Sequence, residues 1–524
     1  MRLTPDQDTH KRETRVRLRE FGLPMLAGLL LFLGGYLFLG GDAPYEEADT
    51  HSFPAFQTME LKVKGKGLWR LRTLREKALQ DGVLMREPND WVKGHLVEGQ
   101  QEWPVRLRLK GDWTDHLQSG KWSFRVELRD TLAYHRLKVF SLQSPRTRSF
   151  LDEWYFHQVL LQEGIMTPRY DFVRLHFNGA ELGIYALEEH FSKQMIEANG
   201  QRESAIYKFN EDGLWEARRE ALRDPDIPFV DLPLYEASHP EAFGYKDLLK
   251  KRELQSTLDQ GQDLMHAYKY GLRPAEELFD LDRMARAYAL IDLFRAHHAL
   301  VWHNRRYYHE PITARLHPVI YDAYSGDVSG QYLNGPFTGY ASNGRTYYDG
   351  RMDLLGTKFF AEESFVYAYY HYLHQYTSPE FLTHLESTFG GLRDRRRDFL
   401  RREYLFFQYK EGRLENAAEE MRGALKIDRE LLEWDVEGGC LKNLNPVAVV
   451  VTVRDYDRRM NDSLNEEGWK TLQPQLPRGA DVLGIMDAYD GRGLADHVSV
   501  PDSVESLTLA IPGSAEVVVL SKTH

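Results

Sequence analysis

Asn304 and Asp322 carry the side chains of this chain that most clearly suggest chemistry. Asn304 belongs to the run HNRRYY and Asp322 to the run VIYDAYSG, and the apolar segments beside them predict two short strands joined by a loop that contains Pro311. Such a hairpin places an amide oxygen and a carboxylate close together at strand ends. Oxygen donors of this kind suit Mg²⁺, which takes one or two protein ligands and completes its shell with phosphate and water. We expect a metal site here, and an ordinary polar strand end is the alternative.

A second hairpin is predicted upstream of these residues. The apolar runs FVRLHF, residues 172–177, and ELGIYAL, residues 181–187, flank Asn178 and Gly179, a pair that favours a tight turn between two strands. The two runs are therefore expected to form neighbouring antiparallel strands.

A helix and a further strand follow this hairpin in the prediction. The helix would begin with Glu188 and Glu189, since acids are favourable at the positive end of a helix, and would stop at Gly200. The strand, residues 205–209, carries Lys208. This mixture of strands and helices predicts a fold of the α+β class.

The order of these motifs resembles the CotH kinase family, the atypical protein kinases first known from bacterial spore coats. The resemblance spans about residues 107–322 and rests on PRYDFVRLHFNGAELGIYALEEHF, AIYKF, HNRRYY and YDAYSG, which occur in this order. It implies an atypical kinase-like core in which an Asn and an Asp, here Asn304 and Asp322, hold the metal on ATP. It also implies that Lys208 neutralises phosphate oxygens and pairs with Glu189, which matches the family's Glu. A surface ion pair of little energetic value is the alternative for Lys208.

Two departures from the family pattern bear on catalysis. The family's Asp is usually followed closely by a second Asp, where this chain has Tyr324. Kinases place a carboxylate a few residues before the metal-binding Asn, where it accepts or orients the substrate proton, but this chain has Ala299 there. A neighbouring imidazole titrates near neutrality and could act as the base instead. We therefore expect His298 and Asp322 to be the catalytic residues.

A loop from Gly111 to Gly120 is predicted between two alternating strands within residues 106–128. It could fold over phosphates with Lys121 at its exit, as in resembling family members, which makes Lys121 a further candidate for nucleotide binding. A plain hairpin loop is the alternative. Neither GxGxxG nor a Walker GxxxxGKS/T pattern occurs, which disfavours a Rossmann or P-loop site.

An N-terminal apolar segment predicts a membrane anchor. Residues 21–41 contain no charged side chain, and a helix of this length would span roughly 31 Å at about 1.5 Å per residue, close to the thickness of a bilayer core. Basic residues precede the segment, and Asp42, Glu46 and Glu47 follow it. The positive-inside rule therefore predicts a single-pass protein of the cell inner membrane, with a cytoplasmic N-terminus and an extracytoplasmic main domain. A cleaved signal peptide is the alternative.

Composition and charge exclude some classes of function. The formal net charge is -12, which argues against nucleic acid as a partner, since nucleic-acid-binding domains carry a basic surface. Cys440 is the single cysteine, so no intrachain disulfide can form and stability must come from packing. Glycines and tyrosines are frequent between Asp322 and Gly350, where the sequence shows no regular pattern of strand or helix. Such a loop could serve as an activation or substrate loop, or its rings could stack on sugars of an envelope polymer.

The chain is too long for one hydrophobic core, so several parts are expected. The boundaries that the sequence predicts are a cytoplasmic basic tail at 1–20, a transmembrane helix at 21–41, a linker at 42–56, a CotH-like kinase-related domain at 57–442 and a small β-rich module at 443–524.

We therefore expect a membrane-anchored CotH-like protein that uses Mg²⁺ and transfers a phosphoryl group from ATP to a protein hydroxyl. The main alternative, favoured by Ala299 and Tyr324, is a pseudokinase or binding protein that acts with an envelope partner in cell-envelope or exopolysaccharide assembly without catalysis. A third class, glycoside hydrolysis, requires two carboxylates about 5 to 10 Å apart, and Asp112 and Asp115 are the local pair that fits its residue types.

Overall fold

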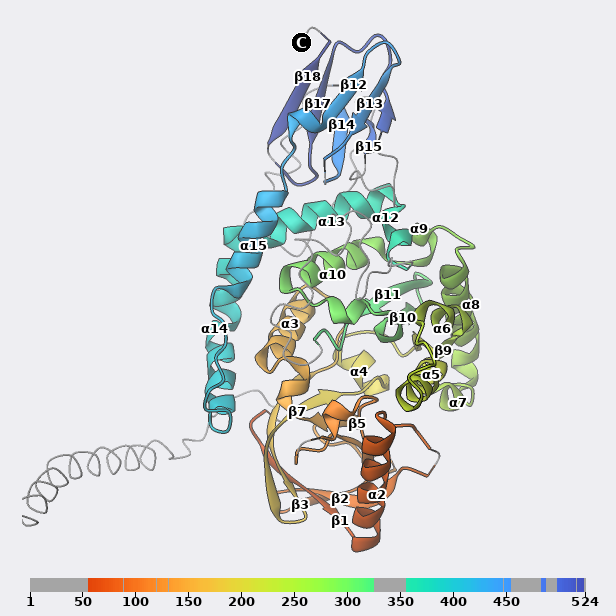
Figure 1. The fold of residues 1–524 in the computed structure, drawn as a ribbon, viewed down its shortest axis with the longest axis vertical. Coiled ribbons are helices and arrows are strands. Elements are labelled where there is room, and N and C mark those ends of the chain that lie inside the picture. The colour runs from red at the N-terminus through yellow and green to blue at the C-terminus, as the bar shows by residue number, and fades with distance from the viewer. Residues whose placement is uncertain are drawn as a thin grey trace, which may run out of the picture. The chain divides into compact units, whose positions relative to one another are not determined.

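The computed structural model contains both helices and sheets, which confirms the predicted α+β class (Figure 1). It describes residues 55–87, 89–118, 120–130, 132–324, 355–445, 447–453, 482–486, 497–514 and 516–522. The predicted basic tail at 1–20 and the glycine- and tyrosine-rich loop from 325 onward lie outside the described residues.

A closed barrel forms the first part of the described chain, with its strands paired in the order β1-β2-β3-β4-β5-β7-β6. The elements of this part are β1 Thr58–Val63, α2 Gly65–Asp81, β2 Val92–Glu98, β3 Gln101–Leu109, β4 Phe124–Leu128, β5 Val139–Gln143, β6 Tyr170–Phe177 and β7 Ala180–Glu189. In β3, Val105, Leu107 and Leu109 are buried in the apolar core of the barrel. Because side chains alternate along a strand, Arg106 and Arg108 lie on the outer face.

The hairpin predicted at Asn178 and Gly179 is present between β6 and β7. Both turn residues have positive φ, 49° for Asn178 and 83° for Gly179, as a type I′ turn requires. The Asn178 side chain also connects the turn to β1, because Oδ1 accepts a hydrogen bond from Val63 N at 2.7 Å and Nδ2 donates to Val63 O at 3.0 Å.

Replacing Asn178 with Ala is therefore expected to lower the free energy of unfolding by about 1–2 kcal/mol, because both hydrogen bonds to Val63 are lost and Ala must adopt positive φ. Urea denaturation of the full chain measures the change. Glu181→Ala, an exposed position in β7, is the control and should change the value by less than about 0.5 kcal/mol. Equal effects of the two substitutions would contradict the role given to the Asn178 side chain.

A 4-stranded sheet with the order β11-β10-β8-β9 contains the strands predicted beside Asn304 and Asp322. Its strands are β8 Ile206–Phe209, β9 Pro240–Ala242, β10 Arg306–Glu310 and β11 Arg315–Val319. β10 and β11 form the predicted antiparallel hairpin, with Arg306 opposite Val319. Asn304 lies just before β10 and Asp322 lies just after β11, so both residues are at the same end of the hairpin.

Helices pack around these sheets (Figure 1). They are α3 Leu151–Gln162, α4 Lys193–Ala198, α5 Asp212–Arg223, α6 Asp231–Ala237, α7 Tyr245–Leu248, α8 Gln255–Tyr270, α9 Ala275–Leu278, α10 Leu281–Phe294, α12 Thr357–Phe360, α13 Glu363–Tyr376, α14 Pro379–Arg401 and α15 Arg413–Ala424. Asp280 caps α10, because its side chain accepts a hydrogen bond from Arg283 N. α10 and α13 lie side by side and bury an aromatic cluster that includes Tyr288, Phe365 and Tyr369.

The helix predicted to begin at Glu188 and Glu189 starts later than expected. Both acids belong to strand β7, and α4 begins at Lys193 with Ser192 as its cap, whose side chain accepts a hydrogen bond from Met195 N. The acids remain in the strand because each is buried and forms an ion pair there, with Lys110 and Arg169 respectively. These contacts outweigh the local preference of acids for a helix start.

The C-terminal part of the described chain is built from strands. β12 Leu432–Asp435, β13 Cys440–Asn443 and β16 His497–Ser499 form one sheet, and β14 Val449–Thr452, β15 Val482–Met486, β17 Ser506–Ala510 and β18 Val517–Ser521 form another. The hairpin β12–β13 begins before the boundary predicted at residue 443, because β13 pairs with β16 and so belongs to the same sheet.

The predicted membrane location requires a correction. None of the helices in the described part of the chain is both long and apolar enough to cross a bilayer. The predicted span at 21–41 lies outside the described residues. The single-pass inner-membrane location is therefore contradicted by this finding.

Two histidines of α13 make stability depend on pH. Burial lowers the pKa of His371 from 6.5 to about 4, and burial together with His371 lowers the pKa of His374 to about 4. Between pH 4 and pH 6.5 the unfolded chain binds more protons at these two histidines than the folded chain does. Their contribution to the free energy of unfolding is therefore fully present above about pH 6.5 and is lost as the pH decreases toward 4.

We expect urea denaturation to show a loss on the order of 2 kcal/mol between pH 6.5 and pH 5 from this pair. The double variant with His371→Gln and His374→Gln should show a smaller loss over the same range. An identical pH dependence in the wild type and the double variant would contradict this assignment.

Candidate active site

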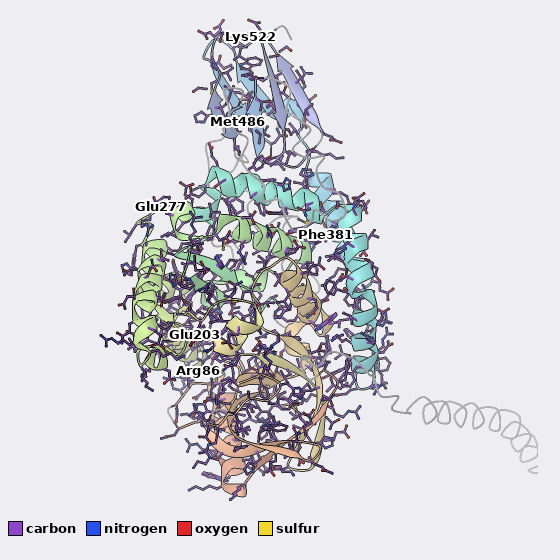
Figure 2. All side chains as sticks on the ribbon, turned by 180° about the vertical axis from the view of Figure 1, so that it is seen from behind. Arg86, Glu203, Glu277, Phe381, Met486 and Lys522 are labelled. Atoms are coloured by element: carbon purple, nitrogen blue, oxygen red, sulfur yellow. The ribbon has the colours of Figure 1, made fainter. Side chains whose placement is uncertain are left out.

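A pocket of about 380 Å³ lies along the outer face of the barrel, and strands β8 and β9 and the segments beside the β10–β11 hairpin complete it. Its lining includes most of the predicted site residues, namely Asn304, Asp322, His298, Lys208 and Glu189. Arg86, labelled in Figure 2, is among its cations. The predicted residue Lys121 does not line it.

Asn304 and Asp322 converge on one imidazole ring. Asn304 Nδ2 and Asp322 Oδ1 each lie 3.2 Å from Nδ1 of His298, which stands in the short 3₁₀ helix His297–Leu300. This nitrogen also lies 2.7 Å from the backbone oxygen of Asp322, which can only accept. Nδ1 is therefore the donor in this contact.

Asp322 forms an ion pair with a residue that sequence reasoning missed. Arg148, at the end of the 3₁₀ helix Pro145–Arg148, places Nε 2.8 Å from Asp322 Oδ1, and both side chains are largely buried. Burial alone would raise the pKa of Asp322, but Arg148 and His298 outweigh burial and hold the pKa well below its usual range. Asp322 is thus ionised, and its backbone has φ of 53°, a strained value for a non-glycine residue that is typical of functional sites.

The donor set fits a small hard cation that also binds phosphate. Within the described part of the chain, Asp322 Oδ1 is buried without a hydrogen bond, although Arg148 and His298 lie within ion-pair distance. Asn304 Oδ1 accepts a long hydrogen bond of 3.4 Å from the Tyr321 hydroxyl. Among the described residues, no group of three or more His, Cys, Asp and Glu side chains could enclose a metal. Mg²⁺ completed by phosphate and water agrees with these two ligands, and it would share Asp322 with Arg148.

A second ion pair in the pocket has the form of the lysine–glutamate pair that kinases use at the phosphates. Lys110 directly follows β3, and its Nζ lies 2.7 Å from Glu188 Oε2. Burial would raise the pKa of Glu188, but Lys110 and Arg148 outweigh burial and lower it. The sequence signal for Lys110 was its place at the end of the alternating run RLRLK, just before Gly111.

The predicted pair between Lys208 and Glu189 is not formed. Lys208 Nζ lies 3.0 Å from Glu241 and 3.6 Å from Glu211, whereas Glu189 binds Arg169 through contacts of 2.6 and 2.8 Å. Lys208 and Glu189 both line the pocket, but their nearest ion-pair partners, Glu241 and Arg169, come from other segments of the chain, which sequence patterns do not reveal.

Lys121, a predicted nucleotide-binding residue, does not line the pocket. Its Nζ pairs with Glu403 at 2.7 Å and donates to the backbone oxygen of Ile184 at 2.7 Å. Because this contact lies outside the pocket, the structure gives no support to Lys121 as a nucleotide-binding residue.

The loop that begins at Gly111 does contribute to the pocket. Asp112 and Asp115 both line it, and Asp112 pairs with Arg86 at 3.0 Å. Burial raises the pKa of Asp112, and Arg86 acts against this effect. Gly111 has φ of 102°, and a side chain there would collide with His116, so the sharp turn into this loop requires glycine.

Comparison with known proteins agrees with the resemblance seen in the sequence. No curated protein matches the chain. The family model described as CotH kinase protein matches residues 107–423, which is more than half of the chain and extends well past Asp322 into α15. It covers the end of β3 and all of β4 to β11, and therefore every predicted site residue. The chain belongs to the CotH kinase family.

Proposed function

We propose that this protein binds a nucleoside triphosphate with Mg²⁺ and transfers the γ-phosphoryl group to a hydroxyl of a protein substrate. The observation that supports this most is the meeting of two groups in one pocket: the Lys110–Glu188 ion pair on the barrel, and Asn304 with Asp322 beside the β10–β11 hairpin. Phosphoryl transfer depends mainly on positioning and charge neutralisation, and these two groups can supply both.

Each group has a distinct role in this proposal. Lys110, oriented by Glu188, neutralises oxygens of the phosphate chain. Asn304 and Asp322 would hold Mg²⁺, which when bound neutralises charge that develops on the phosphates. Arg148 holds Asp322 ionised and in place, and it lines the same pocket.

His298 is the residue that we propose as the base. In the transfer, the bond from the γ-phosphorus to the bridging oxygen breaks and the bond to the acceptor oxygen forms. The proton of the acceptor hydroxyl passes to Nε2 of His298, the nitrogen that is left to accept in the neutral ring when Nδ1 donates to the backbone oxygen of Asp322. Ala299, where kinases hold a carboxylate, is buried and cannot take this role.

A second candidate function is nucleotide binding without transfer. It is favoured by Ala299, by Tyr324 in place of a second acid, and by the ion pair that Arg148 already forms with Asp322. A protein of this type would bind the nucleotide as a signal for association with a partner.

Incubation of the full chain with γ-labelled ATP and Mg²⁺ distinguishes the two candidates. The proposed transfer predicts label on Ser, Thr or Tyr of the protein itself or of an added protein substrate, located by mass spectrometry. A rise in Tm with ATP and Mg²⁺ but no label at any protein concentration would overturn transfer and leave binding as the function.

A further inference from the structure

Two arginines face each other on the wall of the pocket. In the antiparallel pair β3–β4, Arg106 lies opposite Glu127 and Arg108 lies opposite Arg125. Arg106 forms two hydrogen bonds of 2.8 Å to Glu127. Arg108 instead faces a like charge, an arrangement that destabilises an antiparallel sheet. Arg108 and Arg125 line the pocket, whereas Arg106 does not.

Most cations of this pocket are neutralised by carboxylates, as described above for Arg86, Lys110, Arg148 and Lys208. Arg108 and Arg125 differ, because no carboxylate of the described residues lies within ion-pair distance of either. Arg108 donates one hydrogen bond of 3.0 Å to the backbone oxygen of Leu109. Nε and Nη1 of Arg125 are buried and have no hydrogen-bond partner among the residues that the structure describes. Leaving charged donors buried and unpaired is costly unless a ligand compensates them.

The pKa values of Arg108, Arg125 and His190 reflect burial together with this local excess of positive charge. Burial and Arg125 lower the pKa of Arg108 to about 9, and burial lowers the pKa of Arg125 to about 10 against the opposing effect of Glu188. Burial, followed by Arg125 and Arg108, brings the pKa of His190 in the same pocket well below its usual value. This part of the wall therefore favours an anion.

We propose that Arg108 and Arg125 form a two-arginine clamp that binds the phosphate chain of the ligand through its own charges, without a metal ion. The assignment of this chain to a nucleotide rests on the proposed function. Guanidinium groups bind phosphate oxygens through paired hydrogen bonds, which the ammonium of Lys110 cannot do. A phosphate chain would also offset the repulsion between the two arginines, which explains why two arginines stand opposite each other here, while an arginine–glutamate pair occupies the ladder two residues away.

Calorimetric titration of the full chain with inorganic tripolyphosphate in EDTA tests the clamp. The wild type should bind, and the double variant with Arg108→Gln and Arg125→Gln should bind at least about tenfold more weakly, the loss expected for charged hydrogen bonds. Arg106→Gln, on the same strand and face, should bind like the wild type. No binding by the wild type, or equal loss in Arg106→Gln, would overturn the clamp.

Comparison of ligands identifies the source of the phosphate chain. Equal affinities for ATP and tripolyphosphate in EDTA, both reduced in the double variant, support a clamp that recognises the chain alone. Tighter binding of ATP, again reduced in the double variant, supports a clamp that serves a nucleotide. An unchanged affinity of the double variant for both ligands would overturn it.

Arg125→Glu separates this role from a purely structural one. The substitution creates an arginine–glutamate pair like that of Arg106, so the Tm should rise while tripolyphosphate binding falls at least about tenfold. A fall in Tm with retained binding would overturn the proposal. The labelling experiment with ATP is independent: binding that depends on the clamp without any transfer supports the clamp and contradicts the proposed function, and transfer without such binding does the reverse.

Discussion

Asp322→Asn should reduce phosphoryl transfer on the order of 1000-fold, the loss that corresponds to several kcal/mol of charge stabilisation in the transition state. Asn keeps the size and one oxygen of Asp322 but has no negative charge with which to hold Mg²⁺. The side chain lies beside His298 and shares the pocket with Lys110, so the effect should appear in kcat rather than in the affinity for the acceptor protein.

The same substitution leaves Arg148 buried without its partner, so a loss of stability has to be separated from the loss of chemistry. Breaking a buried ion pair of this kind costs about 3–5 kcal/mol. The double variant with Arg148→Gln and Asp322→Asn should recover much of the stability, because no uncompensated charge remains, but it should not recover transfer. Recovery of both would contradict Asp322 as a metal ligand, and so would transfer at the wild-type rate in Asp322→Asn.

Lys110→Met should reduce transfer on the order of 100-fold, since a largely buried lysine would lose its charged contact to the phosphates. Lys121→Met provides a matched control, because Lys121 also forms a lysine–glutamate ion pair of 2.7 Å but lies outside the pocket. The control should leave the rate of transfer unchanged. If the two variants lost activity equally, Lys110 would have no special role at the phosphates.

The elements around the site follow from local sequence patterns. The turn at Asn178 and Gly179 and the β10–β11 hairpin are both predictable, because turn residues and alternating apolar positions act over a few neighbours. The meeting of Asn304 and Asp322 follows from the second hairpin, since its two strands end on either side of them. Fold class and this part of the site are therefore accessible from the sequence.

The partners of the charged residues are not accessible in this way. Lys110 and Glu188 are 78 positions apart, and Glu153, which accepts hydrogen bonds from the backbone at Ala323 and Tyr324, is 170 or more positions from them. No local preference encodes such contacts, which depend on how the barrel and the helices pack. For the same reason Glu188 and Glu189 suggested a helix start, although burial and distant cations keep them in a strand.

A crystal structure of the full chain with Mn²⁺ and a non-hydrolysable ATP analogue tests the central claim most directly, because the anomalous scattering of manganese marks the cation. We predict an anomalous peak within about 2.0–2.3 Å of both Asn304 Oδ1 and a carboxylate oxygen of Asp322, with the triphosphate reaching Lys110. A triphosphate bound elsewhere, or a manganese peak that does not contact Asp322, would contradict the claim that this pocket is a phosphoryl-transfer site.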